Sequence, residues 1–311
     1  MDRTDVGWKG YWTALVTPFA EDGRLDTAAL AELVQRVVDD GAHGMLVNGS
    51  TGEVFVQTPA ERRLVAEIAV QATAGRVPVV VGVTAATPGD AAAYVRHAAQ
   101  IGADGVLSGP PVNARPTEAE LYAYYAEAFD ASELPAWLYN FPQENGHPIS
   151  VDQVGRLIEI DNVVAIKQSS PSIADLIGTI ERYGDRIRVF GHLLSRLGVA
   201  LMSSGFGGDG HFGSGMLFGR RMPEFFDHVW AGRLDEARAI ADIVDSAMAE
   251  LLGAREDGFN WAFGGMQPTL KAAMNIAGQP GGYPRPPKLP LSDPSDLAEI
   301  RRILTKAGVM S

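Results

Sequence analysis

The chain has 311 residues, a formal net charge of −12 and no cysteine. Without cysteine there are no disulfides, thiolate metal ligands or thiol nucleophiles, and the negative charge disfavours nucleic acid and anionic membranes as partners. No apolar run approaches the ~18 residues of a membrane-spanning helix, and the first ten residues lack the apolar core of a secretory signal. We therefore expect a cytoplasmic protein of enzyme size.

Short apolar runs that recur along the chain predict buried strands. Each run is too short for a helix and almost continuously apolar, as expected for strands covered on both faces of a parallel sheet. The eight runs are 11–17, 44–48, 77–83, 105–108, 136–141, 163–167, 187–191 and 210–214.

Segments with helical spacing lie between these runs, and several begin with a residue suited to capping a helix. The expected caps are Asp26 or Thr27, Thr58, Thr87, Thr117 and Ser150. There are about eight strand–helix units, and no Gly-x-Gly-x-x-Gly dinucleotide motif follows the first run. These features favour a (β/α)8 TIM barrel over a doubly wound sheet.

The alternation of strands and helices stops after the eighth run. Helices alone are predicted from there on, at 223–231, 234–252, 264–277 and 294–307, with a connector rich in Gly and Pro at 278–290. The sequence thus predicts an α/β protein with a catalytic (β/α)8 barrel, residues 1–221, and a C-terminal helical appendage, residues 222–311.

Lys167 is the lysine that ends an apolar strand-like run, Val163 to Ile166. Active sites of such barrels lie at the carboxyl ends of the strands. Burial there penalises an ammonium, and lowering its pKa from about 10.4 to about 7–8 gives a neutral amine that can attack a ketone. The alternative is a structural lysine paired with a buried carboxylate such as Glu53.

Other strand ends carry polar residues with two readings each. The turn at 49–53 could cradle an anion, or could be an ordinary capped turn. Tyr139 could move protons near the amine, or could pack with a hydrogen-bonded tip. His192 and His211 could bind substrate hydroxyls or relay protons, but they lack the clustering of a metal site.

Taken together, four motifs resemble the dihydrodipicolinate synthase / N-acetylneuraminate lyase superfamily. They are Gly-Ser-Thr-Gly-Glu at 49–53, Tyr-Asn-Phe-Pro at 139–142, Ile-Lys-Gln-Ser-Ser at 166–170 and Gly-Gly-Asp-Gly at 207–210. They occur in order on successive strand ends, and the resemblance covers nearly the whole chain.

The resemblance implies a class I aldolase-type mechanism without cofactor or metal. Lys167 forms a Schiff base with pyruvate or another 2-oxo acid, Tyr139 is the acid/base, and Ser50 belongs to its proton relay. Ser50 and Thr51 hold the substrate carboxylate, and Phe212 offers a backbone contact. The resemblance also implies a homotetramer built from tight dimers, or a homodimer.

The chain departs from both branches of the superfamily at substrate-binding positions. Asn113 stands where the synthase has a second relay tyrosine, and Glu144 where the synthase has an arginine that grips a carboxylate. Both departures make true dihydrodipicolinate synthase activity doubtful. Ser214 is shared with the sialic acid lyases, but Leu193 and Leu194 replace their sugar-binding acidic pair, which predicts an apolar surface there.

The sequence therefore predicts a lyase that performs reversible aldol cleavage or condensation of pyruvate or a 2-oxo-3-deoxy acid. Two alternatives remain open at this point. One is a dehydratase or hydratase-aldolase that uses the same lysine imine. The other, of a different class, is a non-catalytic relative that binds a ligand without turnover.

Overall fold

The computed structural model describes residues 1–112, 114–253 and 262–310. Eight parallel strands close into a barrel in chain order, and the last strand pairs with the first. The strands are β1 (Gly10–Ala14), β2 (Gly44–Val47), β3 (Val79–Gly82), β4 (Gly105–Ser108), β5 (Ala136–Asn140), β6 (Val163–Gln168), β7 (Arg188–Phe190) and β8 (Gly210–Ser214). The predicted TIM barrel is confirmed.

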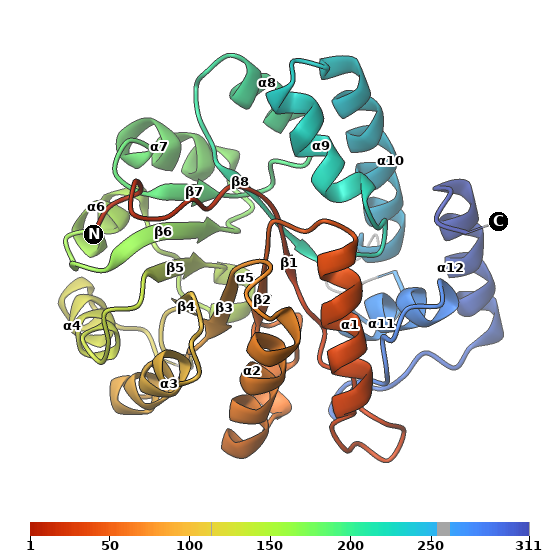
Figure 1. Ribbon diagram of the computed structural model, residues 1–311, viewed down its shortest axis with the longest axis horizontal. Coiled ribbons are helices and arrows are strands. Elements are labelled where there is room, and N and C mark those ends of the chain that lie inside the picture. Colours follow the sequence, from red (N-terminus) through yellow and green to blue (C-terminus); the bar gives the residue numbers. More distant parts are fainter. Residues whose placement is uncertain (113, 254–261, 311) are drawn as a thin grey trace.

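Helices surround the strands, and α11 and α12 lie together at one side of the barrel next to α10 (Figure 1). The helices are α1 (Thr27–Asp39), α2 (Pro59–Thr73), α3 (Pro88–Gln100), α4 (Glu118–Phe129), α5 (Pro142–Asn145), α6 (Val151–Leu157), α7 (Ile173–Tyr183), α8 (Arg196–Ser203), α9 (Arg221–Trp230), α10 (Leu234–Leu252), α11 (Met266–Ile276) and α12 (Pro294–Lys306), with a 3-10 turn η1 (Val54–Val56). Helix α9 contacts both β1 and α10. Within the described ranges, no helix is both long and apolar enough to cross a bilayer.

The predicted helix caps are confirmed by hydrogen bonds. The Asp26 carboxylate accepts from the Ala29 N–H at 2.9 Å. Thr58, Thr117 and Ser150 each form a reciprocal capping box, and Thr87 caps α3. These side chains satisfy donors that the first helical turn leaves unpaired, so the sequence marks helix starts well.

Five of the eight predicted strands are one to three residues longer than the observed ones, β4 and β8 match, and β6 extends one residue further than predicted. The first run, predicted at 11–17, leaves the β1 ladder after Ala14, and Phe19 then forms isolated bridges with Leu25 and Tyr283. The run stays apolar because this loop is buried too. Burial alone therefore does not distinguish a strand from the loop that follows it.

An aromatic cluster fills the inside of the barrel. Trp8 stacks on Trp137 with ring centroids 5.0 Å apart, and Phe212 lies 5.6 Å from Trp12 and 5.1 Å from Trp137. Trp8 sits at the amino ends of the strands, where Gly105, the first residue of β4, leaves room for the indole ring. The interior is thus filled at the amino ends of the strands, and the open end of the barrel lies at the carboxyl ends of the strands.

Candidate active site

Lys167 lies near the end of β6 with its amine in the barrel mouth. The side chain is only 7% exposed. Its Nζ atom is 4.4 Å from the centroid of the Tyr139 ring and 5.1 Å from that of Phe212. Burial lowers the pKa of Lys167 to about 7. Among the described residues no carboxylate forms an ion pair with this amine, so a large fraction of it is the neutral nucleophile near pH 7.

The carboxylate suggested as a structural partner for Lys167 is used elsewhere. Glu53 is fully buried and forms an ion pair with Lys271 of α11. The backbone N–H of Arg285 donates to Glu53 Oε2 at 3.0 Å. The alternative reading, a structural pair of Lys167 with Glu53, is therefore wrong.

Tyr139 and Ser50 form a hydroxyl pair beside the amine. Their oxygen atoms are 3.3 Å apart. Tyr139 is the β5 neighbour of Lys167 in the strand register, which brings the phenol to the lysine. Burial raises the pKa of the Tyr139 phenol, the hydrogen bond from Ser50 opposes this, and nearby Glu144 adds to it. The phenol therefore keeps its proton at neutral pH and can hand it to a substrate oxygen.

The turn at 49–53 follows β2 and leaves two backbone donors free. The N–H groups of Gly52 and Glu53 donate to Gly49 O and Ser50 O, at 3.1 and 3.0 Å. No hydrogen bond within the described chain uses the N–H of Ser50 or Thr51. These two amides, with the neighbouring hydroxyls, can accept a carboxylate. The turn can therefore serve as an anion cradle.

His192 and His211 lie on the other side of the amine, at the end of β7 and on β8. Their ring centroids are 6.0 Å apart. Desolvation in the mouth lowers the pKa of His192, and it lowers that of His211 to about 3, with further contributions from His192 and Lys167. The Leu194 N–H donates to His211 Nδ1 at 3.4 Å. Both rings are neutral near pH 7 and can bond substrate hydroxyls.

Leu193 and Leu194 do not form an apolar surface in the mouth. Their exposed fractions are 0% and 2%, and both belong to the core between the barrel and its helices. The turn after β7, in which the Leu193 N–H donates to Gly191 O at 2.9 Å, directs them there. The predicted apolar surface is wrong; His192 of this turn stays exposed, and the nearby charge of Lys167 helps to lower its pKa.

A cavity of about 680 Å³ opens beside the hydroxyl pair, and Ser50, Tyr139 and Glu144 line it. Desolvation in this cleft raises the pKa of Glu144, against the opposing charge of Lys288. Glu144 also lies close enough to Tyr139 to contribute to the raised pKa of the phenol. Among the other predicted residues, Ser214 is half-buried at the end of β8, and Asn113 lies outside the described residues.

Sequence reasoning missed several polar residues of this cavity, among them Arg62, Thr84, Asp90 and Asn145. Arg62 Nε and Asn145 Nδ2 are buried without a hydrogen-bond partner in the described chain. The Arg62 guanidinium lies 3.8 Å from the centroid of the Tyr94 ring. Arg62 and Asn145 lie on helices, and Thr84 follows β3, for whose carboxyl end the sequence analysis predicted no site residue.

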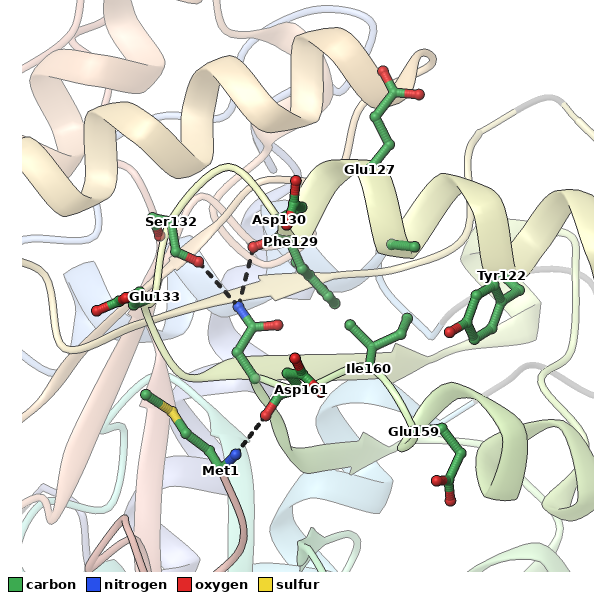
Figure 2. A pocket seen from close by; sticks show the side chains of 12 residues that line it. Met1, Tyr122, Glu127, Phe129, Asp130, Ser132, Glu133, Glu159, Ile160 and Asp161 are labelled. Atoms are coloured by element: carbon green, nitrogen blue, oxygen red, sulfur yellow. Dashed lines mark hydrogen bonds between the residues drawn. The ribbon is translucent and has the colours of Figure 1, made fainter.

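A larger cavity of about 840 Å³ lies away from this chemistry (Figure 2). It is bordered by the end of α4 and by the segments that lead into β5 and β6, at the amino ends of the strands. Figure 2 shows Met1 beside Asp161, whose carbonyl accepts a hydrogen bond from the terminal amine at 2.6 Å. None of the predicted site residues lines it, so size does not identify the active site here.

Within the described residues, no group of three or more His, Asp or Glu side chains is arranged to hold a metal ion. The polar groups at the barrel mouth include an amine, hydroxyls, free backbone amides and two imidazoles. These are the groups that an imine-forming enzyme needs for attack, proton transfer and anion binding.

A closed parallel barrel with such an amine at its mouth defines a lyase of the Schiff-base, aldolase type. The chain belongs to the dihydrodipicolinate synthetase family, whose model matches residues 8–307. The expected family, fold and enzyme class are thereby confirmed, and a non-catalytic relative or a dehydratase is not favoured.

Curated relatives and solved structures agree with this assignment. The chain is 30% identical over 306 residues to the 4-hydroxy-tetrahydrodipicolinate synthase of Gluconacetobacter diazotrophicus, covering 98% of each chain. It is 29% identical to an uncharacterized DapA-like lyase of Rhizobium meliloti, covering 99% of this chain and 98% of the relative. The dihydrodipicolinate synthase structure from Aquifex aeolicus superimposes with a TM-score of 0.85 at 28% identity, covering 97% of this chain and 99% of that one.

A further structure, the chloride-inhibited dihydrodipicolinate synthase of Acinetobacter baumannii complexed with pyruvate, has a TM-score of 0.85 at 25% identity. It covers 97% of this chain and 99% of its own. The similarity therefore extends over barrel and C-terminal helices alike.

Proposed function

We propose that the protein joins pyruvate, or a related 2-oxo acid, to an aldehyde and cleaves the product in reverse, through an imine on Lys167. The observation that best supports this proposal is the buried amine of Lys167. Its pKa is about 7, and its Nζ atom lies 4.4 Å from the centroid of the Tyr139 ring. An amine with that pKa is about half neutral at pH 7, against about one part in a few thousand for an exposed lysine.

The chemistry follows from these groups. Lys167 Nζ adds to the keto carbon, and the keto oxygen leaves as water after proton transfers that the Tyr139–Ser50 pair carries. The iminium withdraws electrons from C3, so a C3 proton is lost and an enamine forms. C3 then attacks the aldehyde carbon, the aldehyde oxygen takes a proton, and water releases Lys167.

The substrate carboxylate would lie on the turn after β2. The free N–H groups of Ser50 and Thr51 supply the donors, and the backbone of Phe212 supplies a contact from β8. The keto carbon would then lie between the amine and the phenol. Because the carboxylate of the 2-oxo acid anchors the substrate on this turn, ketones that lack a carboxylate should react poorly.

The aldehyde end would meet Glu144 on one side and His192, His211 and Ser214 on the other. A carboxylate at Glu144 repels an anionic aldehyde, whereas hydroxyls can bond to both imidazoles. We propose a neutral, hydroxylated aldehyde as the partner, giving a 2-oxo-3-deoxy acid. Efficient turnover of pyruvate with aspartate semialdehyde, above the rate with glyceraldehyde, would overturn this part.

The proposal also covers the oligomeric state and the cellular location of the protein. We propose a homotetramer or homodimer in the cytoplasm, supported by family membership and by the absence of cysteine. Native mass spectrometry of the purified protein tests the assembly directly, and a monomer would contradict it.

Borohydride reduction in the presence of pyruvate tests the central step. We expect a stable adduct on Lys167, found by intact mass and peptide mapping, and none in Lys167→Ala. Lys271 of the wild-type protein is the internal control, because it is also buried but should stay unlabelled. An unmodified wild-type protein, or an adduct on another lysine, would contradict the mechanism.

A further inference from the structure

Helix α11, in the C-terminal region, contacts the substrate-binding turn from behind. Gln267 Nε2 donates to Ser50 O at 3.2 Å, and Lys271 pairs with Glu53 at the other end of the same turn. Gln267, Lys271 and Glu53 are 2%, 1% and 0% exposed. The turn is therefore held at both ends by side chains far away in the sequence.

The Lys271 ammonium joins three segments at once. Besides the Glu53 carboxylate, it donates to the carbonyl oxygens of Thr17 and Tyr283, each at 2.8 Å. An ammonium has three donors, and here all three have a partner. The group thus links the loop after β1, the turn after β2 and the connector before α12 in one fixed geometry.

The turn needs such support because its last residue is unusual. Glu53 has a φ of 55°, in the left-handed region that residues other than glycine rarely adopt. Its side chain is fixed from both sides, by Lys271 and by the Arg285 N–H at 3.0 Å. Holding Glu53 also fixes its own N–H, which donates to Ser50 O at 3.0 Å.

We propose that Lys271 and Gln267 are positioning residues for the 2-oxo acid: they hold the turn so that the Ser50 and Thr51 amides face the substrate carboxylate. This rests on the proposed function, in which those amides bind that carboxylate. The C-terminal helices are then part of the active-site framework. Neither residue touches the substrate.

The test separates carboxylate binding from imine chemistry. Lys271→Met and Gln267→Leu are compared with wild type for borohydride trapping of Lys167, with pyruvate and with acetone, which lacks the carboxylate. For both variants we expect the half-saturating pyruvate concentration to rise about tenfold or more, as when one well-placed hydrogen bond is lost. Trapping by acetone should change less than about twofold, since the amine is untouched.

Two further variants sharpen the test. Lys271→Arg keeps the charge and should recover part of the pyruvate affinity. Lys306→Met is the matched control, because Lys306 pairs with Glu250 at 2.6 Å on the outer face of α12 and does not contact the turn. It should behave like wild type.

Each outcome decides between the two proposals. If folded Gln267→Leu and Lys271→Met trap pyruvate like wild type, the inference is wrong and the proposed function stands. If pyruvate and acetone lose trapping equally, the two residues support the fold in general, and the inference is again wrong. If wild type itself is not trapped at Lys167, both proposals fail. Thermal melts of every variant identify any that is unfolded, and Gln267→Leu, which leaves no charge unpaired, then decides alone.

Discussion

Two buried lysines near the mouth of the barrel have opposite surroundings. Lys167 lies among aromatic rings, no carboxylate of the described residues forms an ion pair with it, and burial lowers its pKa to about 7. Lys271 has Glu53 and two carbonyl oxygens as partners, and Glu53 opposes the effect of burial, so its pKa is lowered only to about 8. Burial is common to both. What distinguishes a nucleophile from a structural ion is whether the ammonium has acceptors.

The largest effect on stability is expected from Lys271→Met. It leaves the Glu53 carboxylate buried without its partner, which typically costs about 3–5 kcal/mol of unfolding free energy. Urea unfolding at pH 7 measures it. The double variant Lys271→Met/Glu53→Leu should regain much of the loss, because it removes the stranded charge as well. A single variant as stable as wild type would mean that the ion pair contributes little.

Lys167→Met is expected to raise the free energy of unfolding, whereas Lys271→Met lowers it. The pKa of Lys167 is lower in the folded than in the unfolded chain, so the unfolded chain binds more protons between pH 7 and about 10.5. Wild-type stability should therefore rise with pH in that window. At pH 7, replacing the amine should raise the unfolding free energy by roughly 4 kcal/mol, and the gain should shrink towards pH 10. A destabilised variant would show that the amine has acceptors after all.

The rate of imine trapping should follow the protonation state of Lys167. With a pKa of about 7, the neutral fraction rises about tenfold per pH unit below pH 7 and levels off above it. Initial rates of borohydride trapping at limiting pyruvate, from pH 5 to pH 9, measure this. A Gln267→Leu variant should give the same profile shape. A rate that still climbs above pH 9 would indicate an ordinary lysine.

The smallest effect is expected from Ser50→Ala. The variant removes the hydroxyl that lies 3.3 Å from the Tyr139 oxygen but keeps the backbone amide. Loss of one neutral hydrogen bond should slow turnover about tenfold. Ser50→Thr retains a hydroxyl and should recover most of the rate. Full activity in Ser50→Ala would place Ser50 outside the proton relay.

The fold was predictable because its signals are local. Buried parallel strands give continuous apolar runs, and caps such as Thr58 and Thr117 mark helix starts within a few residues. The convergence of Ser50, Tyr139 and Lys167 followed from the same local signals, because a closed barrel brings successive strand ends together.

The partners of side chains were not predictable in the same way. Glu53 was a reasonable partner for Lys167 on strand order alone, but its left-handed backbone and the distant Lys271 determine the actual pairing. Leu193 and Leu194 point into the core because of a turn that the sequence pattern does not reveal. Such contacts depend on side-chain direction and on long-range packing rather than on local periodicity.

The aromatic packing of the barrel interior also offers a way to observe the chemistry. Phe212 lies between the indoles of Trp12 and Trp137 on one side and the Lys167 amine on the other. An imine cation formed on that amine would change the electric field at both indoles. Their fluorescence can therefore report ligand condensation in the unlabelled protein, while Trp230, on the outer layer against Lys9, gives a background signal.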